Sequence, residues 1–277
     1  MDNYPTIGFI GAGNMAYALI SGLIESGYSK NNIKASDPNK DLLSLRHDEF
    51  KLEIFTDNSK LTTACDVIVL AVKPQVLPSV CKAIKDNIGH KPLVISIAAG
   101  VRVNDINRWL GGKSSIVRVM PNTPALLGKG AAGIFANDSV SDAQKDLSKE
   151  ILDSVGDCFW VDDEKLLDAV TALSGSGPAY FFLFIESMTK AGVALGLDEE
   201  TAQKLSIQTA LGASVMASNS KDISPRQLRS NVTSPNGTTQ AAINSFQDQN
   251  FEMIVSHAMR AAFERSREMG NELGNDE

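Results

Sequence analysis

The chain has 277 residues, which is enough for one large domain or two of ordinary size. Hydrophobic residues make up 43% of it and charged residues 21%, so a normal packed core is expected. The formal net charge of −7 argues against a nucleic acid or an anionic membrane as a partner.

A strand, a glycine turn and a helix are predicted at the start of the chain. Ile7 to Ile10 is a short β-prone run, and Met15 to Glu25 is helix-prone. Between them, Gly11, Gly13 and Ala16 have the G-x-G-x-x-A spacing of a dinucleotide site. Gly11 permits the turn, and Gly13 has no side chain to keep a pyrophosphate from the backbone. A glycine turn in an ordinary βα unit is the alternative.

The second predicted strand, Ile33 to Ala35, leads to the position where a dinucleotide fold meets the adenosine ribose. Asp37 is suited to the ribose hydroxyls of NAD. Ser36 and Lys40 are suited instead to the 2′-phosphate of NADP, which Asp37 would repel if it pointed inward. The sequence leaves the choice open, and a plain surface turn is the alternative.

Two continuous apolar runs predict strands that are buried on both faces of a parallel sheet, at 66–72 and 93–97. The first stops at Lys73-Pro74-Gln75 and the second at Ala98-Ala99-Gly100. Ligands of such sheets lie beyond the carboxyl ends of the strands, so both turns should face the cofactor. The small residues at 98–100 leave room for a flat ring, although a tight turn explains them equally well.

Strands and helices alternate over the rest of the first 163 residues, which implies a doubly wound sheet. The other predicted strands are 52–55, 115–120, 128–136 and 158–161, with 128–136 as the last of the sheet. The other predicted helices are 41–50, 76–88, 103–110 and 144–155.

The pattern changes at Glu164, after which no segment is typical of a strand. The predicted helical stretches are 166–195, 199–218, 224–231, 238–247 and 251–272. Apolar residues occupy more than one face of these helices, so a helical homodimer interface is expected. We therefore predict an α/β domain over 1–163 and an all-α domain over 164–277.

Two stretches of the helical half stand out. Ser174 to Tyr180 places two glycines and a proline in an apolar helical region, which requires close approach of either a ligand or another helix. Val232 to Thr239 precedes a helix and carries hydroxyl groups that suit a carboxylate. Ordinary helix capping is the alternative for the second stretch.

The remaining side chains that are often catalytic form no recognisable constellation. They are Cys65, Cys81, Cys158, His47, His90 and His257. The cysteines are odd in number and scattered, which is typical of a cytoplasmic protein without disulfides or a metal site. We expect His47 and His90 on the surface, and His257 either packed or snorkelling from a helix to the surface, with no Ser-His-Asp triad and no zinc site. No apolar run has membrane-spanning length, and no signal-type segment is expected.

Taken together, these motifs resemble the pyrroline-5-carboxylate reductase family. The segments that carry the resemblance are 8–15, 71–74, 96–100, 120–124, 173–180 and 234–239, in the family's order and over nearly the whole chain. The last two are specific to the family, whereas the first is shared by many dehydrogenases.

The resemblance implies a Rossmann-type doubly wound sheet followed by an all-α dimerisation domain. It implies reduction of the cyclic imine 1-pyrroline-5-carboxylate to proline by NADPH, with NADH possible, in a homodimer or a ring of dimers. It assigns the cofactor to Gly11, Ala12, Gly13, Asn14, Met15, Ser36, Asn58, Ala71, Val72, Lys73, Pro74, Ala98, Ala99 and Gly100. It assigns the substrate carboxylate to Ser234, Gly237 and Thr238, and the imine nitrogen to Thr239, the one catalytic residue.

One position departs from the family, which usually has glycine where this chain has Asn236. If the backbone there needs a positive φ, asparagine is among the best replacements, so we expect the loop to survive. Two other functions remain open. A β-hydroxyacid dehydrogenase would need a lysine soon after the glycine-rich helix start, but Phe181 stands four residues after Gly177. A dinucleotide sensor without catalysis is the other.

Overall fold

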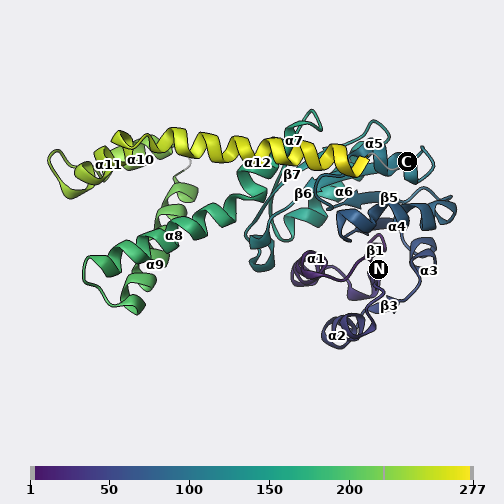
Figure 1. The fold of residues 1–277 in the computed structure, drawn as a ribbon. Helices are drawn as coiled ribbons and strands as arrows, with labels where there is room; N and C mark the ends of the chain where they lie inside the picture. The colour runs from purple at the N-terminus through teal and green to yellow at the C-terminus, as the bar shows by residue number, and fades with distance from the viewer. Residues whose placement is uncertain (1–3, 221, 275–277) are drawn as a thin grey trace. The chain divides into compact units, whose positions relative to one another are not determined.

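The computed structural model describes residues 4–220 and 222–274, and within them eight strands form one sheet in the order β3-β2-β1-β4-β5-β6-β7-β8. Figure 1 shows this sheet between layers of helices. The strands are β1 (Ile7–Ile10), β2 (Ile33–Ser36), β3 (Glu53–Phe55), β4 (Val67–Leu70), β5 (Leu93–Ser96), β6 (Ser115–Met120), β7 (Gly130–Ala136) and β8 (Gly156–Trp160).

Helices connect the strands in the first part of the chain and make up the second part. The first group is α1 (Asn14–Glu25), α2 (Lys40–Phe50), α3 (Asn58–Thr63), α4 (Leu77–Ile84), α5 (Val103–Trp109) and α6 (Asp142–Asp153). The second group is α7 (Leu166–Val170), α8 (Gly177–Ala194), α9 (Glu199–Asn219), α10 (Pro225–Asn231), α11 (Thr238–Asp248) and α12 (Phe251–Gly274). The predicted fold class, a doubly wound sheet followed by helices, is confirmed.

Strand direction reverses once in the sheet. β1 to β6 are parallel to their neighbours, but β6 and β7 pair antiparallel, with Val119 opposite Ile134. β7 then pairs parallel with β8. The prediction that 128–136 is the last strand was wrong in this respect, because β8 lies beyond it and forms the edge. The order 3-2-1-4-5-6 of the parallel part is that of dinucleotide-binding sheets.

Alternate residues of each buried strand supply two separate cores. In β4, Val67 and Val69 face a core built with α1, α2 and α6, whereas Ile68 and Leu70 face one built with α3, α4 and α5. This alternation follows from the period of two in a strand. Helices thus cover both faces, which leaves the carboxyl ends of the strands and the turns after them for a ligand.

Helix α5 begins beside an ion pair between Arg118 of β6 and Glu164, which precedes α7. The Glu164 carboxylate accepts hydrogen bonds from Val103 N and from Nη1 of Arg118, both at 2.8 Å. Arg118 lies on β6 and is only 5% exposed, so this carboxylate is its neutralising partner.

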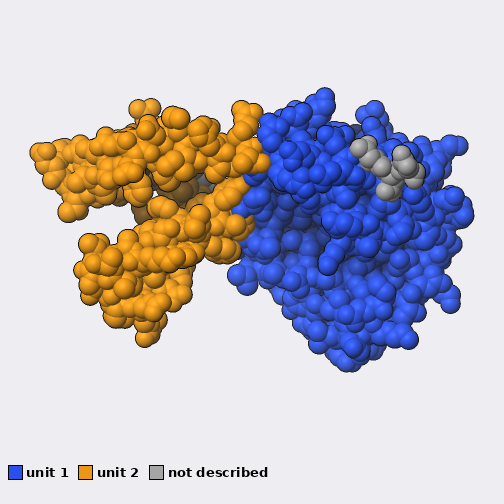
Figure 2. Space-filling view, viewed as in Figure 1, with its two compact units in different colours: residues 1–176, 262–277 blue, residues 177–261 orange. Residues whose placement is uncertain are grey.

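The chain divides into two compact units, coloured separately in Figure 2: residues 1–176 with 262–277, and residues 177–261. Within the second unit, α8 and α9 pack against each other along their lengths. Many large apolar side chains of this unit are exposed, among them Phe181, Phe182, Leu183, Leu211 and Val215. His257, expected to be either packed or snorkelling, is exposed among the described residues of this unit, so it is not packed.

Candidate active site

The turn between β1 and α1 has the backbone that the glycine spacing predicts. Gly11 adopts φ +101°, and a Cβ there would lie 2.6 Å from the carbonyl oxygen of Ala71, so no other residue fits. At Gly13 the opposite holds, because no described atom lies within 4 Å of a Cβ built there. Packing therefore does not require Gly13, whereas a ligand against the backbone would.

The N-terminus of α1 offers its N–H groups to a ligand. Gly13 is the N-cap and supplies no side-chain hydrogen bond, and the first turn contains no acidic residue. The helix dipole adds a partial positive charge there. Unoccupied donors, positive potential and the space above Gly13 fit the pyrophosphate of a dinucleotide.

Backbone N–H groups hold the carboxylate of Asp37, the acidic residue that follows β2. The two Asp37 carboxylate oxygens accept hydrogen bonds from Ala12 N at 2.9 Å and from Asn39 N at 2.8 Å. Asp37 thus links the turn after β2 to the turn after β1. Ser36 is buried, and its hydroxyl donates to Oδ1 of Asn58 at 2.6 Å, which brings these two predicted cofactor residues together.

The sequence reasoning missed Arg46, a buried cation on α2. Its Nε donates to the carbonyl oxygen of Ala12 at 3.3 Å, and its guanidinium lies 4.3 Å from the ring centroid of Tyr17. Ala12 therefore has its N–H held by Asp37 and its carbonyl by Arg46. No local pattern marks Arg46, because its partner lies 34 residues earlier in the chain.

The other predicted cofactor residues follow β4 and β5 at the same edge of the sheet. Ala71 N donates to the carbonyl oxygen of Ile10 at 2.8 Å, which seats the turn 71–74 against the glycine turn. Gly100 adopts φ +79° at the end of the turn after β5. The structure thus brings the whole predicted cofactor set to the carboxyl ends of β1 to β5, in the first unit.

The predicted substrate residues lie together in the second unit, at the start of α11. Gly237 is the N-cap, and no side-chain hydrogen bond caps this helix among the described residues. Asn236 adopts φ +59°, the condition under which asparagine is a suitable replacement for glycine, and its N–H donates to Oε1 of Gln240 at 2.7 Å. Thr238 and Thr239 are exposed in the first turn. Helix N–H groups and threonine hydroxyls are suitable donors for a carboxylate.

The glycines at 174–180 differ in their surroundings. A Cβ on Gly175 would lie 2.4 Å from Cε of Met120, at the end of a π-helical turn over Thr171–Gly175. The Met120 methyl group is the end of a flexible side chain and can move aside, so this contact alone does not require glycine at 175. No described atom lies within 4 Å of a Cβ on Gly177, so packing does not account for that one.

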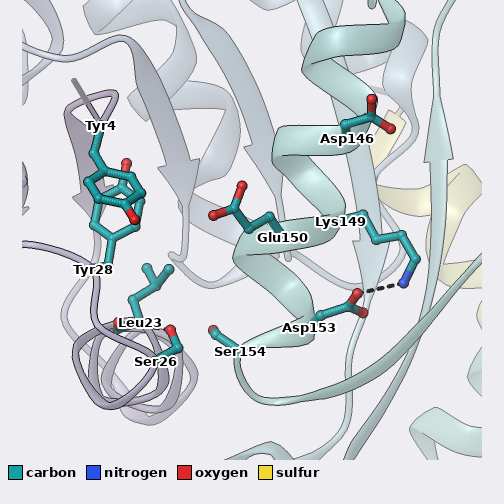
Figure 3. Close-up of a pocket in the computed structure, with 9 residues that line it drawn as sticks. All are labelled: Tyr4, Leu23, Ser26, Tyr28, Asp146, Lys149, Glu150, Asp153 and Ser154. Carbon is teal, nitrogen blue, oxygen red and sulfur yellow. Dashed lines mark hydrogen bonds and ion pairs between the residues drawn. The ribbon is translucent and has the colours of Figure 1, made fainter. Parts of the chain in front are cut away.

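The first unit also contains a cavity of about 500 Å³ at the amino ends of the strands, opposite the glycine turn (Figure 3). Tyr4 and Tyr28 pack against each other on one side of it, with ring centroids 4.7 Å apart and ring planes tilted by 48°. Helix α6 supplies acidic side chains on the other, where Asp153 pairs with Lys149 at 2.6 Å. An acidic wall does not suit the phosphates of a dinucleotide, so the cavity is not part of the predicted site.

No helix of residues 4–220 and 222–274 is long and apolar enough to cross a membrane.

Comparison with known proteins matches two family models to this chain. Residues 6–100 match "NADP oxidoreductase coenzyme F420-dependent", and residues 164–269 match "Pyrroline-5-carboxylate reductase dimerisation". The first range contains every predicted cofactor residue, and the second contains every predicted substrate residue.

Relatives of known activity cover nearly the full length. The chain is 49% identical to a pyrroline-5-carboxylate reductase of Pseudomonas aeruginosa over 270 residues, 98% of each protein. A solved reductase from Coxiella burnetii superposes with a TM-score of 0.93 at 42% identity, covering 96% of this chain and 99% of that one. The Plasmodium falciparum pyrroline carboxylate reductase with NADP bound gives 0.85 at 36% identity, covering 98% and 99%. The chain therefore belongs to the pyrroline-5-carboxylate reductase family.

Proposed function

We propose that this protein reduces 1-pyrroline-5-carboxylate to proline with NADPH as the hydride donor. Full-length similarity to reductases of this name supports the activity, and the relative with bound NADP supports the cofactor. The observation in this chain that carries the proposal is the glycine turn, where Gly13 leaves free space above the uncapped N-terminus of α1.

The cofactor is assigned to the turns at the carboxyl ends of β1 to β5. Gly11 to Met15 hold the pyrophosphate through backbone N–H groups, and Ala71 to Pro74 flank it. Ala98, Ala99 and Gly100 are small enough to lie against a flat nicotinamide ring. When bound, the reduced nicotinamide supplies the hydride, while these residues set its orientation and exclude water.

The 2′-phosphate of NADPH is assigned to the turn between β2 and α2, where Lys40 is exposed at the start of the helix and carries a positive charge. The buried Ser36 hydroxyl already donates to Asn58, so these two side chains support the turn beneath that group. Asp37 directs its two carboxylate oxygens to the N–H groups of Ala12 and Asn39, and this supports its use in holding the turns rather than in binding ribose hydroxyls. On these grounds we expect NADPH to be preferred over NADH.

The substrate carboxylate is assigned to Ser234, Gly237 and Thr238 at the start of α11. The Thr239 hydroxyl oxygen accepts a hydrogen bond from the N–H of the protonated imine and fixes its position, and Thr239 is the one residue assigned to the reacting bond. A protonated imine is already a good electrophile, so the protein needs no strong general base. The residues at the start of α11 therefore act by orienting the substrate and by compensating the charge of its carboxylate.

The active form is a homo-oligomer. The match of residues 164–269 to a dimerisation model and the exposed apolar side chains of the second unit support a dimer through this region. Three points stay predictions from the sequence. They are the larger ring of dimers, the boundary at 163/164 between a cofactor-binding and a substrate-binding domain, and the cytoplasmic location.

The test is a steady-state assay with both nicotinamide cofactors. We expect 1-pyrroline-5-carboxylate to be reduced to proline while NADPH is oxidised. The oxidation is measured as a loss of NADPH absorbance after the imine is added. kcat/KM should be higher with NADPH than with NADH. A chain that binds NADPH tightly but does not oxidise it with this imine would be a sensor, which contradicts the proposal.

A further inference from the structure

The end of α12 packs on the turn that follows β5. Although the first half of α12 belongs to the second unit, residues 262–274 belong to the first. All contacts described in the next two paragraphs are internal to the first unit.

Side-chain contacts tie this end of the helix to α7, to the residues that follow the turn, and to α5. Oγ of the buried Ser266 donates to Oδ1 of Asp168 at 2.6 Å. Nη2 of Arg102, two residues after Gly100, donates to Oδ1 of Asn271 at 2.5 Å. One turn further, Nη2 of Arg108 on α5 donates to the carbonyl oxygen of Gly274 at 3.0 Å.

Gly270 lies in the middle of these contacts and is buried. A Cβ on Gly270 would lie 3.2 Å from the carbonyl oxygen of Gly100, closer than a methyl group packs without displacing its neighbour. Conversely, a Cβ on Gly100 would lie 3.3 Å from Leu273 and 3.5 Å from Met269. The helix and the turn therefore meet backbone to backbone, with no room for a side chain between them.

Helix propensity makes this glycine informative. Glycine is the least favourable residue in a helix after proline, so α12 would be more stable with alanine at 270. The sequence gives up that stability where the helix approaches the Ala98–Gly100 turn most closely. If the only effect of this glycine were to destabilise the helix, it would not need to be buried against the carbonyl oxygen of Gly100.

We propose that the end of α12 sets the depth of the Ala98–Gly100 turn under the nicotinamide, with Gly270 as the positioning residue. This inference rests on the proposed function, which assigns the nicotinamide to that turn. A side chain at 270 pushes Gly100 toward the ring and changes the distance over which the hydride passes. A shift of about 1 Å costs about 100-fold in rate, so a few tenths of an ångström costs about 3- to 5-fold.

The test compares Gly270→Ala and Gly270→Val with Glu268→Ala, a control on the exposed face of the same helix turn. Gly270→Ala is expected to lower kcat about 3- to 5-fold, and Gly270→Val more than 10-fold. Both should keep the Kd for NADPH within about 2-fold, because the pyrophosphate and adenosine contacts are untouched. With NADPH deuterated at the transferred position, the isotope effect on kcat should rise. The Tm of Gly270→Ala should stay close to that of the wild type, because the gain in helix propensity offsets the displacement of the turn.

Two results overturn the inference alone, given an active wild type. The first is wild-type kcat in both Gly270 variants. The second is a loss of kcat that Glu268→Ala shares. A loss of kcat in Gly270→Ala that is accompanied by a similar fold-loss of NADPH affinity, or by a clear decrease in Tm, counts in the same way, because a merely structural role would give it. A wild-type chain without reductase activity overturns the proposed function, and this inference with it.

Discussion

Removing the Glu164 carboxylate should strongly destabilise the first unit. Glu164→Ala leaves the Arg118 guanidinium, 5% exposed, without its carboxylate, and it leaves Val103 N, the first N–H of α5, without an acceptor. Breaking a buried ion pair by deleting one partner costs about 3–5 kcal/mol. The Glu164 side chain is 19% exposed, so water replaces part of the loss. We expect a decrease of about 3 kcal/mol in the free energy of unfolding.

The assay is urea unfolding at one fixed protomer concentration, since an oligomer gains stability by mass action. In a thermal scan, about 3 kcal/mol corresponds to a decrease of about 6–12 °C in Tm. Replacing both partners by apolar residues, Arg118→Met with Glu164→Leu, should recover most of the loss. Lys145→Ala removes an exposed partner of Asp142 on α6 and should leave the midpoint unchanged. The reasoning fails if Glu164→Ala unfolds at the wild-type midpoint, or if the double variant is no more stable than the single one.

Three further predictions test the site and the core. Gly13→Val should abolish NADPH binding, measured by fluorescence, while the fold persists, because no described atom occupies the space of the new side chain; tight NADPH binding would contradict the placement of the pyrophosphate. Thr239→Ala should lower kcat/KM for the imine by about 10–100-fold, and unchanged kinetics would remove Thr239 from the site. Burial raises the pKa of the Cys81 thiol to about 12 from an ordinary 9.0. The unfolded chain therefore releases this proton first as the pH rises above 9, and stability falls by about 1.4 kcal/mol per pH unit up to 12. Unfolding from pH 8 to 11 should show a shallower loss in Cys81→Ala, and equal slopes would mean that the thiol is not protected.

Strong local patterns predicted most of the fold. The buried strands β4 and β5 are continuous apolar runs, and the turn at Gly11 follows from its spacing. The sequence could predict only that asparagine at 236 would tolerate a positive φ, and the backbone there does adopt one. Helix α3, whose six residues are polar or small except for Leu61, was missed because its amphipathic pattern is too short to detect.

Features that depend on distant partners could not be predicted. The direction of β7 is set by its pairing with β6, and composition does not encode it. Arg46 is an ordinary charged residue of α2 until the fold brings it to Ala12. The same holds for Gly270, whose role depends on a contact with Gly100, 170 positions earlier. Sequence patterns indicate which backbone a segment adopts, whereas such contacts follow from the tertiary fold.

The division of the chain has a consequence for biosynthesis. Because residues 262–274 complete the unit that contains β1, that unit lacks a wall until these residues have left the ribosome. Synthesis from the amino terminus can order the early βα units, but the surface around Val103 and Gly100 stays uncovered until α12 arrives. A chain truncated before residue 262 would therefore expose its nucleotide-binding half to chaperones and proteases, although every predicted cofactor residue lies at or before Gly100.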